Sequence, residues 1–384
     1  MTSRRSFMKI AGTSAVVLVA GAAGLTQCDP MPEAAVGAWK GPAPLTRDPR
    51  LRALSYALLA PNPHNMQPWI VDLRTPNEIT FICDRTRLLP QTDPYSRQIT
   101  IGCGAFLELL RMAAAEQGFR AEITAFPQGD WPANDVGEQP VCRVVFVADP
   151  GVGRDALFAQ VLKRRTNRDA YAAAAVTGEQ VSSIQASMSQ LPVIFGWTNE
   201  AGQMARLRGI AKRAWDVEIG TDATYMESVK VYRVTGDEIL QHRDGLSFRG
   251  PLFWWMKTLG LFSREKGLQG DKFMRDQAYP IIDGQINSTA AFGWIVTSSN
   301  DRRAQLASGA AYVRANLSAA GMGLGMQPLS QALQEYKEML GLLAEHKRAL
   351  GLPDSDTVQM FFRIGRAAQV EPAPRRTLDD IIRT

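Results

Sequence analysis

The stretch Pro61-Asn62-Pro63-His64-Asn65-Met66-Gln67-Pro68-Trp69 joins two segments with different periodicity. Residues 50–59, before it, have apolar side chains at helical spacing, and the prolines must end that helix. Residues 69–73 and 78–82, after it, are typical of two strands joined by a turn. The resulting corner holds backbone amides and two side-chain amides that can bind the polar edge of a ring. Taken alone, such a corner is more often a structural turn.

The rest of the chain has a layout that occurs twice. In a first half, residues 48–156, we expect a helix over 101–117 that ends at Gly118, followed by a strand over 143–148. In a second half, residues 157–384, a strand over 293–298 precedes a helix over 301–320 that ends in a glycine-rich turn, and 359–365 is the last strand. The shared layout predicts an α+β chain with an internal repeat.

The N-terminal residues are typical of an export signal. Ser3-Arg4-Arg5-Ser6-Phe7-Met8-Lys9 precedes a soft apolar run from Ile10 to Leu25, which predicts a twin-arginine signal over 1–28 and a periplasmic protein. That route carries folded proteins, often because a cofactor is inserted first. An uncleaved membrane tether, or a lipid on Cys28, is the alternative. Residues 29–47 hold several prolines and are expected to be a linker.

Composition excludes several classes of protein. With 45% apolar and 21% charged residues in 384, the chain can bury a large core. Removing the signal leaves 40 Lys and Arg against 38 Asp and Glu, so the charge indicates no nucleic-acid partner. Cys83, Cys103 and Cys142 form neither a disulfide framework nor a zinc pattern, and the three histidines are not spaced as metal ligands.

Three further segments could bind a ligand. Lys163-Arg164-Arg165-Thr166-Asn167-Arg168, at the expected end of an amphipathic helix, has the forked donors that match phosphate oxygens, although a solvated charge run is the usual alternative. Arg375-Arg376 lies near the C-terminus, and Gln327-Pro328-Leu329-Ser330 follows the glycine-rich turn. Together with the corner, these segments supply what a mononucleotide cofactor needs. Residues 245–283, rich in aromatic and basic side chains, suit either a helical flap over a site or a surface helix.

This set of motifs resembles the nitroreductase-fold flavoproteins. Residues 61–69 are similar to that family's Pro-Ser-x-x-Asn-x-Gln-Pro-Trp segment, and residues 164–168 to its Arg-x-Ser-x-Arg/Lys phosphate motif. Both lie in one chain here, as in the fused, Acg-like branch. The resemblance implies two pseudo-symmetric halves, each with an antiparallel-type sheet flanked by helices, around one FMN. It implies no second site, because neither half repeats the other half's motif.

The resemblance implies a role for each matching residue. Arg164, Thr166 and Arg168, with Arg165 beside them and Arg375 and Arg376 closing from the tail, would hold the FMN phosphate. Pro61, Asn62, Pro63, Asn65 and Gln67 would meet the ring and ribityl chain, and Pro328, Leu329 and Ser330 would line the isoalloxazine. Asn62 and Pro63 replace the usual serine, and Ser330 stands where many active reductases have an acidic residue.

The implied activity is hydride transfer through the flavin to a small organic acceptor of the nitro or quinone type. No catalytic side chain is assigned, since a lone His64 at a turn and a buried Cys103 are more often structural. The alternative is a protein that binds or sequesters FMN without turnover. The expected partners are a small-molecule substrate and the twin-arginine export machinery, and the internal pseudo-dimer predicts a monomer.

Overall fold

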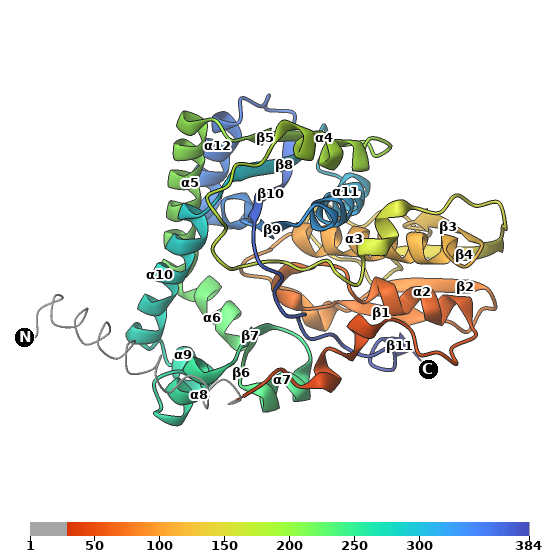
Figure 1. Cartoon of the computed structure of the whole chain (residues 1–384), viewed down its shortest axis with the longest axis horizontal. Helices are drawn as coiled ribbons and strands as arrows, with labels where there is room; N and C mark the ends of the chain where they lie inside the picture. Colours follow the sequence, from red (N-terminus) through yellow and green to blue (C-terminus); the bar gives the residue numbers. More distant parts are fainter. Residues whose placement is uncertain (1–28, 384) are drawn as a thin grey trace, which may run out of the picture.

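Two sheets, one from each half of the chain, form the frame of the molecule in the computed structural model, which describes residues 29–383 (Figure 1). The expected export signal lies outside these residues. The first sheet has the order β11-β1-β2-β4-β3 and the second the order β5-β8-β10-β9. The strands are β1 (Trp69–Asp72), β2 (Glu78–Cys83), β3 (Phe119–Ala125), β4 (Cys142–Ala148), β5 (Ile194–Thr198), β8 (Ala291–Thr297), β9 (Leu324–Pro328), β10 (Thr357–Arg366) and β11 (Ile382–Arg383). The α+β class is confirmed.

The two sheets have the same topology. Strands β1-β2-β4-β3 and β5-β8-β10-β9 pair antiparallel throughout, and only β11 joins its neighbour β1 in parallel. In each half one long helix connects the second strand to the third. These helices are α3 (Arg97–Ala115) and α11 (Arg302–Gly321), and each lies close to its expected position. The layout noticed in the sequence therefore corresponds to one order of strands built twice.

The helices α3 and α11 cross at glycines. A Cβ added at Gly104 would overlap the backbone of Leu306, and one added at Gly309 would overlap the carbonyl oxygen of Ile101. Nearly every residue of α3 is buried; α3 is also the one helix among the described residues that is long and apolar enough to span a membrane. Glycine permits backbones to approach to distances that any side chain would prevent. This crossing therefore joins the two halves.

Two buried arginines reach across between the halves in a reciprocal way. Arg97, the first residue of α3, donates to the carbonyls of Leu333, Val358 and Gln359 in the second half. Arg302, the first residue of α11, donates to the carbonyls of Pro132, Ala133 and Asp135 in the first half. Each helix thus begins with an arginine that donates to backbone carbonyls of the other half. These carbonyls lie in the loop between that half's third and fourth strands, or in the fourth strand itself.

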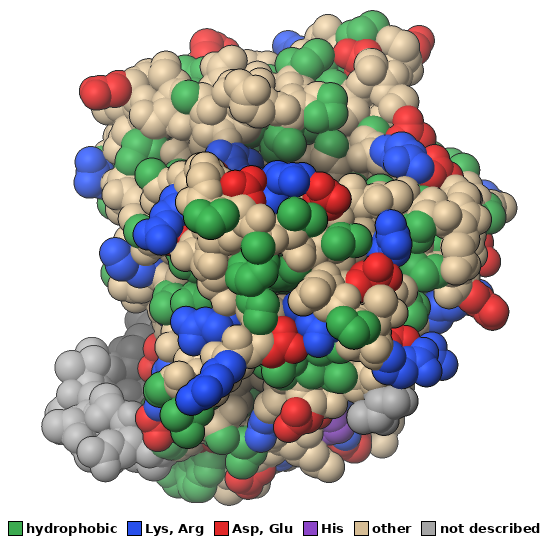
Figure 2. Space-filling model, turned by 90° about the vertical axis from the view of Figure 1, so that its right-hand side faces the viewer, with side chains coloured by type: hydrophobic (Ala, Val, Ile, Leu, Met, Phe, Trp, Pro, Cys, Tyr) green, Lys and Arg blue, Asp and Glu red, His purple; other side chains and the backbone are tan. Residues whose placement is uncertain are grey.

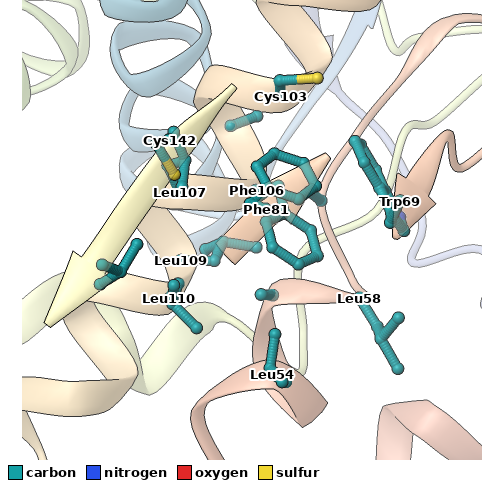
Figure 3. Packing of buried hydrophobic residues seen from close by; sticks show 14 of the residues in the cluster. Leu54, Leu58, Trp69, Phe81, Cys103, Phe106, Leu107, Leu109, Leu110 and Cys142 are labelled. Carbon is teal, nitrogen blue, oxygen red and sulfur yellow. The ribbon is translucent and has the colours of Figure 1, made fainter. Parts of the chain in front are cut away.

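The first sheet packs its aromatic residues against α3 and α2 (Pro49–Ala57). The ring of Phe106 lies 4.6 Å from Phe81 and 4.9 Å from Trp69, with Leu54 of α2 nearby (Figure 3). Cys83, Cys103 and Cys142 are free thiols in this core. A hydrogen bond with the Cys83 thiol, and then burial, raises the pKa of Cys103 well above its ordinary value. The thiol therefore stays protonated and is a poor nucleophile.

A helical insertion, residues 221–288, interrupts the second half between α5 (Ala201–Gly220) and β8. It comprises α6 (Asp222–Lys230), β6 (Tyr232–Val234), α7 (Gly236–His242), β7 (Leu246–Phe248), α8 (Pro251–Thr258), α9 (Arg264–Leu268) and α10 (Lys272–Asn287). Tyr225, Val229, Phe262 and Met274 belong to its own apolar cluster. The expected flap over 245–283 is therefore only the C-terminal part of a larger packed unit.

Residues 29–47 are not the linker we expected. They form two short 3-10 helices, η1 (Glu33–Ala35) and η2 (Gly37–Lys40), in which Ala35 and Trp39 are buried. We call residues 33–40 the N-terminal strap. The segment after β10, residues 367–383, is the C-terminal tail; it leaves the second sheet and ends as β11 on the first.

The remaining helices are short: η3 (Pro63–Asn65), η4 (Arg85–Arg87), η5 (Ala156–Gln160), α4 (Gly178–Ser187), η6 (Gln331–Leu333), η7 (Lys337–Met339) and α12 (Leu340–Ala349). The amphipathic helix expected before Lys163 is only the five-residue 3-10 helix η5. On the face in Figure 2, acidic and basic side chains are interspersed, and no extended basic surface is visible there.

Candidate functional site

The corner expected from the sequence is a strained turn. His64, Asn65 and Gln67 all have positive φ, between 48° and 53°, a conformation that L-residues rarely adopt. The Asn62 carboxamide oxygen accepts from the Gln67 backbone N–H at 2.8 Å, and the Gln67 side chain donates to the carbonyls of Asn65 at 3.2 Å and Arg243 at 2.9 Å. Such strain persists only where surrounding contacts determine it. Asn62 and Gln67 therefore hold the turn itself.

Beside the corner, three arginines surround one tryptophan. The guanidinium carbons of Arg164, Arg165 and Arg375 lie 5.6, 4.1 and 5.2 Å from the ring centre of Trp39. We call these four residues the arginine cluster. Arg164 donates to the Leu59 carbonyl at 2.8 Å, and Arg375 donates to the Asn65 side-chain oxygen at 2.7 Å. The cluster thus connects the second half, the tail and the strap to the corner of the first half.

Among the described residues, the positive charge in this cluster has no counter-charge. In that part of the chain, three buried nitrogens, Arg164 Nη1, Arg165 Nε and Arg375 Nε, have no hydrogen-bond partner. Within residues 29–383, none of the three guanidinium groups forms an ion pair with a carboxylate. Buried polar groups normally have partners, and buried charges normally have counter-charges. The cluster therefore concentrates positive charge and unpartnered donors in one part of the described structure.

The same crowding shifts the titration of these groups. Burial, opposed by Tyr312 and assisted by the charge of Arg165, lowers the pKa of Arg164 to about 10. Burial, then the charges of Arg164 and Arg165, lowers the pKa of Arg375 to about 9. These shifts express the cost of placing like charges together away from water. A bound dianion would reverse their direction.

The rest of the cationic run lies at the edge of the second sheet. Thr166 bridges to Met326 of β9, and the Asn167 N–H donates to the Met326 carbonyl at 3.1 Å. The Arg168 side chain is exposed, although the protein packed around its guanidinium lowers its pKa. Because it is exposed, Arg168 can be reached by a ligand that the buried arginines hold.

His64 is partly buried at the tip of the corner. Its Nε2 lies 2.9 Å from the Ser228 hydroxyl of the helical insertion. Burial, followed by the charge of Arg168, lowers its pKa to about 4, so the ring is neutral at pH 7. His64 therefore holds no proton to donate as an imidazolium at neutral pH, and it ties the corner to the insertion.

Three expectations about site residues need correction. Gln67 was expected to meet the ring, but it is completely buried, and its carboxamide oxygen accepts from the Arg376 N–H at 2.8 Å while its NH2 bonds the corner and Arg243. Arg376 was expected to close on a phosphate, but its side chain donates to the carbonyls of Gln67 at 3.0 Å, Trp69 at 3.3 Å and Asp380. Leu329 was expected to line a flat ring, but its side chain is buried in the core of the second half with Leu333 and Phe361. Arg376 therefore fastens the tail to the corner.

The other expected residues keep a position at the site or its margin. Pro61, Pro63 and Asn65 are partly exposed on the corner, and Pro328 and Ser330 are partly exposed at the end of β9. Asn65 also donates to the Pro374 carbonyl at 3.0 Å. The sequence did not indicate Trp39, whose one local signal was an isolated aromatic residue in a proline-rich segment.

The helical insertion contacts the corner directly. The Gly245 N–H donates to the Asn65 carbonyl at 3.2 Å, and Arg87, next to the corner, pairs with Asp244 at 2.6 Å. The carboxylate of Glu227 accepts from the N–H groups of Gln91 and Thr92, each at 2.8 Å. The insertion is therefore fixed to the first half on the side of the corner.

Comparison with known proteins gives distant but nearly full-length similarity. The chain is 26% identical over 337 residues to Putative NAD(P)H nitroreductase Rv3131 of Mycobacterium tuberculosis, which covers 86% of this chain and 89% of that protein. It is 25% identical over 361 residues to Putative NAD(P)H nitroreductase acg of the same organism, covering 88% and 96%. No protein-family model matches the chain.

Among solved structures, the chain is similar to the FMN-dependent nitroreductase NfnB from Mycobacterium smegmatis, described in complex with NADPH. The match has 19% identity, a TM-score of 0.37, and covers 59% of this chain and 97% of that one. The two M. tuberculosis proteins, in contrast, align with this chain over most of their length. Over most of its length, the chain is thus similar to proteins described as putative NAD(P)H nitroreductases.

Proposed function

We propose that this chain is an FMN-dependent oxidoreductase of the nitroreductase type, acting on a small organic acceptor such as a nitro compound or a quinone. The observation that carries the proposal is the arginine cluster, with three unpaired buried nitrogens and no carboxylate. Arginine N–H groups match the oxygens of a phosphate, and the charge-assisted bonds are strong. The cluster also adjoins the strained corner through Arg375 and Asn65.

The residues present fit the FMN phosphate. Arg164, Arg165 and Arg375 each have a buried donor without a hydrogen-bond partner among the described residues. Their guanidinium groups all lie within 5.6 Å of the Trp39 ring centre, and Thr166 and Arg168 continue the run in sequence. Asn65 and the backbone of residues 61–63 would meet the ribityl chain and ring. When bound, FMN supplies the hydride chemistry, while the chain orients it and keeps water from its phosphate. An NAD(P)H donor is part of this proposal.

The second candidate function is flavin sequestration without turnover. The helical insertion favours it, because bonds from Gly245, Arg243 and Ser228 fasten the insertion to the corner where the ring would lie. A ring covered in this way would be kept from acceptors. Both functions require the same phosphate site, and they differ in whether the flavin can be reduced.

The setting in the cell is also a proposal. The sequence over 1–28 supports export by the twin-arginine route to the periplasm, with a membrane-tethered form if the signal is retained. The repeated topology supports a fused, two-repeat member of the family that acts as a monomer on a small molecule, and the near-neutral charge gives no reason to expect a nucleic acid.

The first experiment is to replace Arg164 and Arg375 together by Gln. Removing two charge-assisted donors should weaken FMN binding by about 100-fold or more, while the flavin-free double variant stays folded, as its circular dichroism should show. Arg154→Gln, at an exposed arginine without an ion pair, is the control for lost charge. Unchanged FMN affinity in the double variant would contradict the phosphate assignment.

The second measurement separates the two candidate functions. The FMN-loaded protein is mixed with NADH or NADPH under nitrogen and its visible absorbance is followed. Bleaching of the flavin, and its return on adding a nitro compound or a quinone, supports the oxidoreductase. A flavin that stays oxidised with both donors, yet is reduced by dithionite, supports sequestration.

A further inference from the structure

We propose that Trp39 is a positioning residue of the anion site, and that it makes the site select a phosphorylated flavin over an unphosphorylated one. This inference rests on the proposed FMN function and deepens it. Trp39 lies in the strap, far from both motifs that indicated the site in the sequence. It touches the arginines and acts on the ligand through them.

The geometry around Trp39 is that of a support for cations. Three guanidinium groups lie within 5.6 Å of one ring centre, with Arg165 closest at 4.1 Å. The electron-rich face of an indole attracts cations, most strongly where water is excluded. Trp39 is only 8% exposed. Its ring therefore offsets part of the repulsion among three like charges, in the absence of any carboxylate that could do so.

The strap is also bonded to the tail that carries Arg375. The Trp39 indole N–H donates to the Ala373 carbonyl at 2.8 Å, and the Arg375 backbone N–H donates to the Ala35 carbonyl at 2.9 Å. The Arg375 side chain then reaches Asn65 at 2.7 Å. The strap and the tail thus form one clasp, and the clasp sets the position of the arginine that completes the cluster.

These contacts have a consequence for ligand choice. An anion that binds the cluster neutralises the repulsion within it, so it should tighten the clasp. Riboflavin has the ring and ribityl chain of FMN and lacks the phosphate. Without the Trp39 ring the three guanidinium groups would lose the surface that holds them together, so FMN binding should weaken and riboflavin binding should stay unchanged. A purely structural role for Trp39 would weaken both ligands equally.

The test compares Trp39→Leu, Trp39→Phe and wild type in the full chain, with FMN and riboflavin titrated into each. We expect FMN affinity to fall about tenfold in Trp39→Leu, and Trp39→Phe, which keeps an aromatic face, to recover a good part of it. Riboflavin affinity should not change. Trp131→Leu is the matched control, because Trp131 is also buried and its indole N–H donates to a backbone carbonyl, that of Gln139, whereas the three arginines lie over the ring of Trp39.

A second readout needs no flavin. Lys40 is an exposed trypsin site at the end of the strap. Inorganic phosphate and FMN should each slow cleavage after Lys40 in wild type, and phosphate should give less protection in Trp39→Leu. Equal losses of FMN and riboflavin affinity would overturn the inference. So would a rate of cleavage after Lys40 that neither phosphate nor FMN changes. Protection by phosphate in a protein that does not bind FMN would refute the flavin function and the flavin selectivity, and would support only the part of the inference that makes Trp39 a positioning residue of an anion site.

Discussion

At the scale of single residues, buried groups without partners stand out in two places. In the arginine cluster the unpaired atoms belong to three guanidinium groups packed around one tryptophan ring, and among the described residues no carboxylate pairs with them. His346 of α12 is the contrasting case. Its ring is completely buried against Phe361, with centres 4.5 Å apart, and neither ring nitrogen has a partner. No other charged group is close enough to shift its pKa, so this histidine carries a cost without an evident use.

The loss of folding stability caused by burying His346 should depend on pH. Burial lowers its pKa to about 4, whereas the unfolded chain takes up the proton near pH 6.5. The unfolded state therefore binds more protons between these values, and stability is lost as the pH falls from 6.5 toward 4. His346→Leu should be neutral to about 1 kcal/mol stabilising at pH 7, and should gain about 2 kcal/mol more relative to wild type at pH 5.

Urea unfolding of both proteins at pH 7 and pH 5 measures this difference. Comparing variant with wild type at each pH cancels the opposite contributions of other groups. Burial raises the pKa of Glu218 to about 7, for example, and that effect stabilises the folded state at low pH and is lost as the pH rises. Parallel pH profiles for variant and wild type would contradict the assignment to His346.

At the scale of elements, the crossing of α3 and α11 decides how the halves meet. Gly104 and Gly309 occupy corresponding places on the two helices, and each faces the backbone of the other helix. Packing of this kind leaves no room for adjustment, since a methyl group would meet carbonyl atoms that cannot rotate away. The glycines therefore matter here for close approach.

Gly309→Ala should lower the free energy of unfolding by at least about 2 kcal/mol, because the helices must separate to admit the new methyl group. Gly284→Ala, in α10, is the control: a Cβ there meets nothing within 4 Å, so helix propensity alone should stabilise the protein by about 0.5–1 kcal/mol. Chemical unfolding of the two variants beside wild type gives both numbers. A Gly309→Ala protein as stable as wild type would show that the crossing can relax.

At the scale of the whole molecule, the two halves of the chain are held together in several places. The two sheets share one strand order, and Arg97 and Arg302 reach across in the same sense. Arg164, in the cationic run of the second half, donates to the Leu59 carbonyl just before the corner of the first. The tail adds β11 to the first sheet after leaving the second, which fastens the halves a further time.

We therefore expect the protein to be a monomer with one flavin site. Sedimentation equilibrium should give the mass of one chain with and without FMN, and titration should saturate at one FMN per chain. Two FMN per chain would mean that the pseudo-symmetric position also binds. A dimer that forms only with FMN would mean that the site needs a second copy.

The sequence alone was enough to predict many of the local elements. Helical and strand periodicity located α3, α11, β1, β2, β4, β8 and β10, because burial on one face leaves a regular pattern in the chain. The corner and the run 164–168 were recognisable because a turn of prolines and amides, or a cluster of guanidinium groups, keeps its chemistry wherever it lies.

Only the tertiary structure decided which of these groups act together. Trp39 and Ala373 are 334 residues apart in the chain and bonded in the fold, and no local pattern can report such a contact. Likewise, Arg375 and Arg376 are neighbours in sequence, but one completes the cluster and the other donates to backbone carbonyls. The physical reason is that residue type determines what a side chain can bind, whereas packing between distant segments determines which partners it finds and which of its donors remain free.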